Sequence, residues 1–249
     1  MKHILSRVRR AVEDYQMIEA GDKIAVGVSG GKDSLVALAA MKSLQRFYPK
    51  PFDVMAITLD MGAEDMDFAP VAEFCRELDV PYVIEQTGIR QIVFDYRQEK
   101  NPCALCANLR RGALNNTAKA NGCNKVVLGH HYDDVVETFF LSLFFEGRLG
   151  CFSPVTYLTR SEITVLRPLI YVREKAIKKY AREAQLPIVE NSCPADGNSK
   201  RAYVKEVINR MDAENRGLKD RAFTALVRSG IDGWRPLTEE NDIVNEHNQ

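Results

Sequence analysis

The stretch VGVSGGKDSLVAL, Val26–Leu38, decides the fold because it joins an apolar run to a helix-length segment through two glycines. The run KIAVGV at 23–28 predicts a buried strand, and residues 35–47 predict the helix that follows it. Gly30 and Gly31 allow a sharp turn that brings backbone N–H groups close to a ligand. The stretch therefore predicts a strand, a tight loop and a helix.

The loop between these two elements has the composition of a phosphate-binding loop. A helix N-terminus favours anionic oxygens, Lys32 adds a mobile positive charge, and Ser29 and Ser34 add hydroxyl donors. It is not a Walker A loop, which needs GxxxxGK[ST], because Asp33 follows the lysine. The full string SGGKDS between a strand and a helix is a much stronger signal than a glycine turn alone.

Outward from this loop, apolar runs alternate with helix-length segments, which is typical of a parallel α/β sheet. Further strands are expected at residues 53–59, 81–86, 125–130 and 163–169, and further helices at 69–79, 106–120, 173–185 and 199–214. The sequence thus predicts the α/β class, a parallel sheet with helices on both faces, a short N-terminal helix and a C-terminal helical extension. We expect an N-terminal helix over 1–20, the main domain over 21–215 and a tail over 216–249 that is loose after Gly230.

The composition indicates a cytoplasmic protein that is not in a membrane. Of the 249 residues, 45% are hydrophobic and 27% are charged, as in soluble globular proteins. The charged N-terminal stretch lacks the apolar core of a signal peptide. The most apolar run, VVETFFLSLFFEG at 135–147, contains Glu137 and is shorter than the roughly 20 residues that span a bilayer. In the cytoplasm a CxxC motif is more often metal-binding or catalytic than a structural disulfide.

The formal net charge of zero conceals an uneven distribution. Residues 160–228 hold fifteen basic and nine acidic side chains, a net charge of +6. For any single cluster a solvated helix face is the favoured explanation. A basic region of this size also suits a phosphate-rich partner.

A second polar segment, GHHYDD at Gly129–Asp134, follows the strand expected at 125–130. Its two acids could stabilise the N-terminus of a helix through the helix dipole, or they could act in a site beside the glycine loop. Because that loop is only one strand-crossing away, the functional explanation is favoured. His130 and His131 lack the spacing that places two metal ligands on one helix face, so we expect contact or packing roles for them.

The cysteines fall into two groups. Cys103 and Cys106 form a CxxC at the expected start of a helix, which alone allows a redox disulfide, half a zinc site, part of an iron–sulfur site or chance packing. With Cys193 they make three candidate thiolates, a number that favours a [4Fe–4S] cluster with one open iron over a four-ligand structural zinc site. The other three, Cys75, Cys123 and Cys151, are expected to be small buried apolar residues.

SGGKDS resembles the PP-loop of the N-type ATP pyrophosphatases, which have an adenine nucleotide alpha hydrolase-like fold. They cleave ATP to AMP and pyrophosphate. The segments AITLDMG and GHHYDD resemble the ends of two further strands in that superfamily. The resemblance implies that the pyrophosphate end of ATP is held by Ser29, Gly30, Gly31, Lys32, Asp33 and Ser34, and that Asp33 acts through Mg²⁺. It also implies that the backbone around Ala56 and Thr58 faces the adenine, with Asp60 near the nucleotide. In the third segment, it implies that Gly129 makes room for the nucleotide and that Asp133 or Asp134 binds metal or assists the acceptor.

The segments CALCANLRRGAL, LGHHYDDVVETFF and VLRPLIYVREKAI resemble the TtcA-type tRNA 2-thiolation enzymes, over roughly residues 20 to 210. This resemblance implies that Cys103, Cys106 and Cys193 hold a [4Fe–4S] cluster and that Arg110 lies near the reacting groups. The implied reaction adenylates the C2 oxygen of a pyrimidine, most simply converting cytidine to 2-thiocytidine. The chain departs from the family in lacking a second cysteine close to Cys193, which leaves the exact substrate open. It also lacks the paired-CxxC zinc ribbon of the related TtuA enzymes.

The implied partners are tRNA and a sulfur donor, either a cysteine desulfurase or inorganic sulfide. The apolar helix around 135–145 is either core or the face of a homodimer, and core is favoured. Three other activities remain open: amidation by a PP-loop enzyme, which needs no cysteines; sulfur transfer to another tRNA position or a small molecule; and redox sensing by an ATP- and cluster-binding protein.

Overall fold

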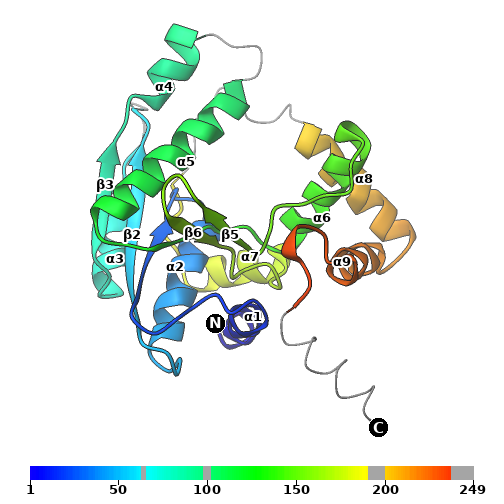
Figure 1. Cartoon of the computed structure of the whole chain (residues 1–249), viewed down its shortest axis with the longest axis horizontal. Coiled ribbons are helices and arrows are strands. Elements are labelled where there is room, and N and C mark those ends of the chain that lie inside the picture. Colours follow the sequence, from blue (N-terminus) through cyan, green and yellow to red (C-terminus); the bar gives the residue numbers. More distant parts are fainter. Residues whose placement is uncertain (63–65, 98–101, 190–199, 237–249) are drawn as a thin grey trace.

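The computed structural model describes the chain except residues 63–65, 98–101, 190–199 and 237–249 (Figure 1). Its strands are β1 (Asp22–Gly27), β2 (Phe52–Asp60), β3 (Tyr82–Gln86), β4 (Lys125–Val127), β5 (Val155–Leu158) and β6 (Ile163–Leu166). Its helices are α1 (Lys2–Asp14), α2 (Lys32–Gln45), α3 (Ala69–Glu77), α4 (Ile89–Gln91), α5 (Pro102–Ala120), α6 (Tyr132–Leu141), α7 (Glu174–Glu183), α8 (Lys200–Glu214) and α9 (Leu218–Ser229), with π-helical turns η1 (Ile92–Arg97) and η2 (Ser142–Glu146) and a 3₁₀ turn η3 (Ile231–Gly233). None of the described helices is long and apolar enough to cross a membrane.

The strands form one sheet in the order β3-β2-β1-β4-β6-β5. All neighbouring pairs are parallel except β5 and β6, which are antiparallel. The predicted parallel sheet is confirmed, and β5 is an addition that its short, half-exposed VTYL sequence did not indicate. The chain leaves β1 toward β2 on one side and returns to β4 on the other. The carboxyl ends of β1 and β4 therefore form a topological switch point, where open α/β sheets bind ligands.

Helices cover both faces of the sheet, as predicted, but unequally. On one face α5 packs through Leu114 and Ala118 against strand residues that include Met55. On the other face α1, α2, α3 and α7 enclose the larger core (Figure 1). Residues 34–41 of α2 are all buried because α1 and α7 pack against α2 as well. A helix covered on all sides needs no polar stripe, which explains the nearly continuous apolar sequence LVALAAM.

The packed core includes more of the C-terminal segment than the sequence suggested. Trp234 is fully buried, its Nε1 donates to the carbonyl of Phe152 at 2.9 Å, and its own carbonyl accepts the hydroxyl of Tyr15 at 2.7 Å. The indole ring also meets Phe223 of α9 edge-on, at 5.6 Å between centroids. The expectation of a loose chain after Gly230 is therefore wrong as far as residue 236, because one large aromatic side chain ties this segment to α1 and α9.

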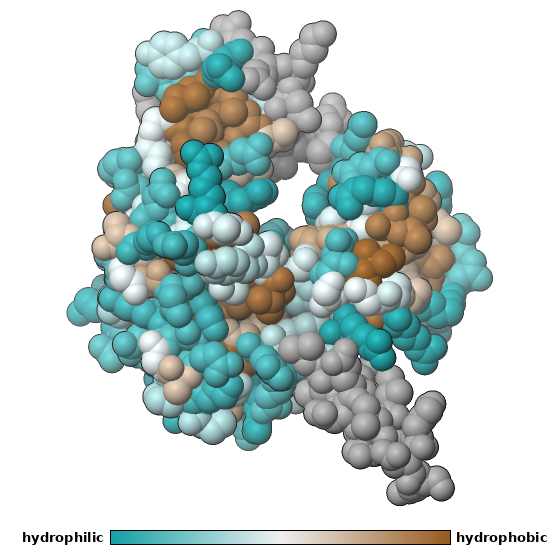
Figure 2. All heavy atoms as spheres, viewed as in Figure 1, coloured by the Kyte–Doolittle hydropathy of each residue, from teal (hydrophilic) through white to brown (hydrophobic). Residues whose placement is uncertain are grey.

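The apolar helix at 135–145 divides into two parts. Val135 and Val136 of α6 are buried in the core, as favoured by the sequence. In η2, Phe144 and Phe145 are 49% and 41% exposed, so this end of the helix is surface. Figure 2 shows hydrophobic residues at the surface on the side of α8 and α9, and a hollow between that side and α5.

Candidate active site

The loop between β1 and α2 is held in place by its own side chains. The N–H of Ser29 donates to Ser34 Oγ at 3.1 Å, and Ser34 Oγ donates to the carbonyl of Gly31 at 2.8 Å. Gly30 has φ +81°, and a Cβ there would lie 2.9 Å from Val189 Cβ. Both the backbone conformation and the lack of space require glycine at this position. The loop ends at the N-terminus of α2, whose backbone N–H groups favour an anionic oxygen.

Lys32 and Asp33 form an ion pair at the start of α2. Lys32 Nζ lies 2.9 Å from Asp33 Oδ2 and 3.4 Å from Glu174 Oε1 of α7. Burial lowers the pKa of Lys32, but the two carboxylates outweigh it and the pKa is raised. Asp33 Oδ1 is buried and has no hydrogen-bond donor among the described residues; His131 Nε2 lies 3.6 Å away. A buried, unsatisfied carboxylate oxygen next to an anion-binding loop is the kind of ligand that Mg²⁺ prefers.

The GHHYDD segment is both a helix cap and a wall of the site. His131 is the N-cap of α6: the N–H of Asp134 donates to His131 Nδ1 at 3.4 Å, and the N–H of His131 donates to Asp134 Oδ2 at 2.9 Å. This capping box fixes Asp134, which lines the cavity described below.

Asp133 points elsewhere. Its Oδ2 accepts the N–H of Glu174 and its Oδ1 accepts Lys219 Nζ at 2.9 Å, so both oxygens are used inside the protein. Burial raises the pKa of Asp133, but these bonds outweigh it and the pKa is lowered. The two acids offered as alternatives by the sequence therefore differ: Asp134 faces the cavity, and Asp133 joins α6 to α7 and α9.

Gly129 is required by packing. A Cβ at this position would lie 2.9 Å from the carbonyl carbon of Asp33 and 3.0 Å from the N of Ser34, which are backbone atoms. The end of β4 thus lies directly against the first turn of α2. The family resemblance implies that Gly129 makes room for the nucleotide. In the structure, Gly129 makes room for the backbone at the first turn of α2.

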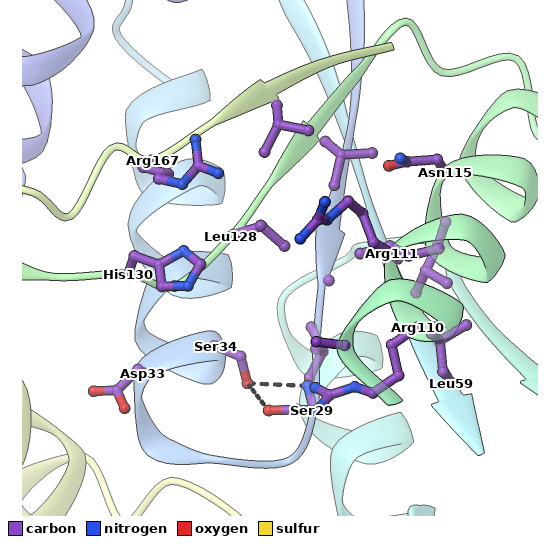
Figure 3. Close-up of a pocket in the computed structure, with 18 of the residues that line it drawn as sticks. Ser29, Asp33, Ser34, Leu59, Arg110, Arg111, Asn115, Leu128, His130 and Arg167 are labelled. Carbon is purple, nitrogen blue, oxygen red and sulfur yellow. Dashed lines mark hydrogen bonds between the residues drawn. The ribbon is translucent and has the colours of Figure 1, made fainter. Parts of the chain in front are cut away.

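These elements border one cavity with a volume of about 690 Å³ at the switch point. Ser29 and Ser34 lie at its base, Arg110 and Arg111 of α5 on one side, and His130 and Arg167 on the other (Figure 3). Its size is within the usual range for small-molecule and cofactor sites. Loop, cap and helix α5 are thereby brought together around a single space.

In and directly after β2, the residues that line the cavity alternate along the chain with the residues that the family resemblance singled out. Ile57, Leu59 and Met61 line the cavity, whereas Ala56, Thr58 and Asp60 do not. Successive side chains of a strand point to opposite faces, so only one set can face α5. Thr58 is fully buried on the other side, where its hydroxyl donates to the carbonyl of Val28 at 2.7 Å. Asp60 Oδ1 accepts the N–H of Gly62 and stabilises the turn after the strand.

One face of α5 carries the other half of the site. Ala107, Arg110, Arg111, Leu114 and Asn115 line the cavity. Cys103 and Cys106 lie four residues before Ala107 and Arg110, which is one helical turn, so the two thiols continue this stripe toward the helix N-terminus. Cys103 is exposed and Cys106 is half-buried. Neither Arg110 nor Arg111 has an ion-pair partner within the part of the chain that the structure describes.

The two described thiols of the predicted cluster site, those of Cys103 and Cys106, could hold a metal–sulfur group. Cys103 and Cys106 are free, accessible and one turn from the cavity, and two cysteines three apart at a helix start can share one cluster. Cys193 falls outside the described residues. The other three cysteines are buried, as predicted: burial raises the pKa of Cys75 to about 11 and that of Cys151 to about 12, and also raises that of Cys123. Such thiols are poor ligands because the thiolate is disfavoured.

Sequence reasoning missed Phe152 and Arg167 altogether and expected only contact or packing for His130. The rings of His130 and Phe152 lie 4.8 Å apart at an angle of 33°, and the Arg167 guanidinium lies over Phe152 at 5.1 Å. Burial and the charge of Arg167 lower the pKa of His130 to about 4. The available signal was Arg167 itself, a charged residue directly after the apolar strand ITVL.

Comparison with known proteins gives a consistent result. The sequence model of the PP-loop domain family matches residues 2–211. The tRNA-cytidine(32) 2-sulfurtransferase of Geobacter sulfurreducens is 39% identical over 228 residues, 90% of this chain and 89% of that protein. The protein of the same name from Aliivibrio fischeri is 40% identical over 227 residues, 90% and 74% of the two chains. Among solved structures, the U34-tRNA thiolase NcsA from Methanococcus maripaludis, with its [4Fe-4S] cluster, has a similar fold, with a TM-score of 0.75 at 23% identity over 91% of this chain and 77% of that one.

Proposed function

This chain belongs to the PP-loop domain family, together with proteins named tRNA-cytidine(32) 2-sulfurtransferase, and from this premise we propose that it is an ATP-dependent tRNA thiolase. It adenylates the C2 oxygen of a cytidine and replaces that oxygen with sulfur, releasing AMP and pyrophosphate. The observation that carries the proposal is one cavity bordered by an anion-binding loop, two arginines without an ion-pair partner among the described residues and, one turn further along α5, two accessible thiols.

In the first step the cytidine O2 attacks the α-phosphorus of ATP, and the bond to pyrophosphate breaks. The backbone N–H groups of residues 29–34 hold the departing phosphates at the N-terminus of α2. Asp33 and Asp134 would hold Mg²⁺, which would neutralise charge on the phosphates, and Lys32 leaves its partner Asp33 to share the negative charge. The product is a base whose C2 carries AMP, a good leaving group.

In the second step a C–S bond forms at C2, and the C–O bond to AMP breaks. Cys103, Cys106 and, in this proposal, Cys193 would hold a [4Fe–4S] cluster, which would bind the incoming sulfide through one of its irons. Arg110, one turn from Cys106, lines the cavity together with the loop and stabilises the negative charge on the departing AMP. Its lack of an ion-pair partner among the described residues supports this assignment.

The partner is tRNA, and the sulfur donor is a cysteine desulfurase or inorganic sulfide. In this proposal the protein works in the cytoplasm, together with the tRNA that it modifies. The exposed Phe144 and Phe145 of η2 are the part of the 135–145 helix that a homodimer would cover.

Anaerobic purification and single-turnover assays test the function. We expect iron and sulfide in the protein, AMP formation that depends on tRNA, and 2-thiocytidine in the digested tRNA. An iron-free protein that forms AMP with another acceptor would favour an amidating enzyme. AMP formed with a free nucleoside instead of tRNA would favour a small-molecule sulfur transferase, and a cluster without any AMP formation would favour a redox sensor.

A further inference from the structure

The cavity has a second polar wall that the reaction scheme above does not use. Opposite α5, beyond the loop, it is lined by His130, Phe152, Ser153, Thr156 and Arg167 (Figure 3 labels His130 and Arg167). These residues come from the ends of β4 and β6, from β5 and from the segment before β5. We call them the β6 compartment.

Arg167 is an unusual residue for a partly buried position. Its Nη1 donates to the carbonyl of Ser153 at 2.6 Å and to Thr156 Oγ1 at 3.1 Å, while its Nε is buried and has no acceptor in the described part of the chain. No carboxylate pairs with it among the described residues. A buried cation without a counter-ion is costly, so its remaining N–H groups call for an acceptor from a ligand.

The groups around Arg167 are flat. The rings of His130 and Phe152 are in contact at a tilt of 33°, and the guanidinium lies over the Phe152 ring. Proteins recognise unpaired bases by stacking on aromatic rings and guanidinium planes and by hydrogen bonds to the edge of the base. This compartment therefore suits a planar heterocycle with acceptor atoms better than a tetrahedral phosphate.

The opposite side of the cavity suits the nucleotide cofactor. Its β2 residues Ile57, Leu59 and Met61, together with Met66 and Phe68, are apolar. Because β1 lies between β2 and β4, the phosphate-binding loop lies between the apolar side and the β6 compartment. An ATP whose phosphates occupy the loop can thus place adenine on the apolar side and leave the β6 compartment for the acceptor.

We propose that the β6 compartment binds the target base and that Arg167 is the residue that selects cytosine over uracil. The proposal rests on the thiolase function above. A guanidinium only donates hydrogen bonds. The N3 atom of cytosine is an acceptor, whereas uracil carries a hydrogen at N3, so a donor aimed at this position favours cytosine and meets a second donor in uracil.

The test uses the cluster-loaded protein and two forms of one tRNA transcript, with cytidine or uridine at position 32, the position in the names of the relatives. The variants are Arg167→Gln and, as a matched control in the turn between β5 and β6, Arg160→Gln, an exposed arginine. A glutamine amide either donates or accepts, so it accommodates both bases. Single-turnover thiolation, the ATP dissociation constant and iron content are measured for each protein.

Arg167→Gln is expected to lower thiolation of the cytidine transcript and to reduce the cytidine-to-uridine rate ratio by about 10- to 100-fold. The ATP dissociation constant is expected to change by less than about 3-fold, and Arg160→Gln to match the unchanged protein. A loss of ATP affinity as large as the loss of rate would assign the compartment to ATP and overturn the proposal. An unchanged rate ratio would overturn it too. Absence of tRNA-dependent AMP formation in the unchanged protein would instead refute the thiolase function.

Should Arg167→Gln lose iron or unfold, Thr156→Val gives the same test with less disturbance. It keeps the guanidinium and removes one acceptor that orients it. The expected result is a fall in the rate ratio of about 3- to 10-fold with unchanged iron content, since one of the hydrogen bonds that orient the guanidinium is lost. A rate ratio equal to that of the unchanged protein would contradict a selecting role for Arg167.

Discussion

At the scale of single residues, unsatisfied groups identify the reactive parts of this molecule. Asp33 Oδ1 is buried and no described residue donates a hydrogen bond to it, whereas both oxygens of Asp133, in an equally promising sequence motif, are bonded within the protein. Free polar atoms in a cavity await a ligand, and satisfied ones hold the scaffold. Of the two neighbours Asp133 and Asp134, the cavity-facing Asp134 is the one that we assign to chemistry.

Asp33→Ala is expected to lower tRNA-dependent AMP formation by about 10³-fold or more, because Mg²⁺ loses a ligand at the transferring phosphate. Iron content should stay the same, since Cys103 and Cys106 lie on α5 and Asp33 lies on α2. Asp53→Ala, which removes an exposed acid at the start of β2, serves as the control. Undiminished AMP formation in Asp33→Ala would remove this carboxylate from the mechanism.

Cys103→Ala and Cys106→Ala are each expected to lose the cluster and the thiolation activity, since three thiolates leave no spare ligand. Cys75→Ala, a substitution of a thiol whose pKa burial raises to about 11, should keep both. Iron and sulfide analysis with visible absorbance measures the outcome. Full iron content in Cys193→Ala would refute the three-cysteine site.

At the scale of elements, α6 connects the site to the C-terminal helices. Its first turn carries the capping box of His131 and Asp134, and its second turn carries Glu137, which is 4% exposed. Glu137 Oε1 has no hydrogen-bond partner in the described structure and lies 3.7 Å from Lys205 Nζ of α8. Burial, partly offset by Lys205 and reinforced by Asp134, raises the pKa of Glu137 to about 7.

This raised pKa predicts a pH-dependent stability of the α6–α8 contact. The folded protein holds the Glu137 proton up to pH about 7, while the unfolded chain releases it near its ordinary pKa of about 4.5, so the free energy of unfolding falls as pH rises between these values. Glu137→Gln, which stays neutral, should gain up to about 3 kcal/mol relative to the unchanged protein between pH 5 and 8. Urea unfolding at several pH values measures the difference, and parallel curves would refute a raised pKa.

At the scale of the whole molecule, two segments far apart in the chain complete one core. Trp234 lies among Tyr15 directly after α1, Phe152 of the β6 compartment and Phe223 of α9. The same indole donates to the carbonyl of Phe152, whose ring lines the cavity. The C-terminal segment thus supports the site from behind.

Trp234→Ala is expected to lower the free energy of unfolding by about 3 to 5 kcal/mol, the usual cost of removing a buried large aromatic side chain. Phe47→Ala, at an aromatic residue that is 52% exposed, should cost less than about 1 kcal/mol. Chemical denaturation of both variants measures this. A cost for Trp234→Ala no larger than that for Phe47→Ala would mean that the C-terminal segment is not part of the core.

Local sequence determined the sheet, its phosphate-binding loop and the accessible CxxC, because strand and helix periodicity, glycine turns and small motifs act over a few residues. The sequence pattern also distinguished the three buried cysteines from the accessible Cys103 and Cys106. It could not identify which face of β2 lines the cavity with its side chains, which is the face of Ile57 and Leu59. The family resemblance concerned the backbone around Ala56 and Thr58 and the neighbourhood of Asp60, and that assignment stays a prediction.

Only the tertiary structure decided the rest: that Asp133 is bound by Lys219, that Gly129 makes room for the backbone of Asp33, that Trp234 is core, and that Arg167 faces a cavity with no counter-ion among the described residues. The partners Lys219, Asp33, Phe152 and Tyr15 lie between 82 and 219 residues away along the chain. Long-range packing fixes such relations, and no periodicity in the sequence records them. Short sequence motifs therefore carry the reactive residues of the site, whereas its proposed selectivity depends on how strands that are distant in the sequence pack together.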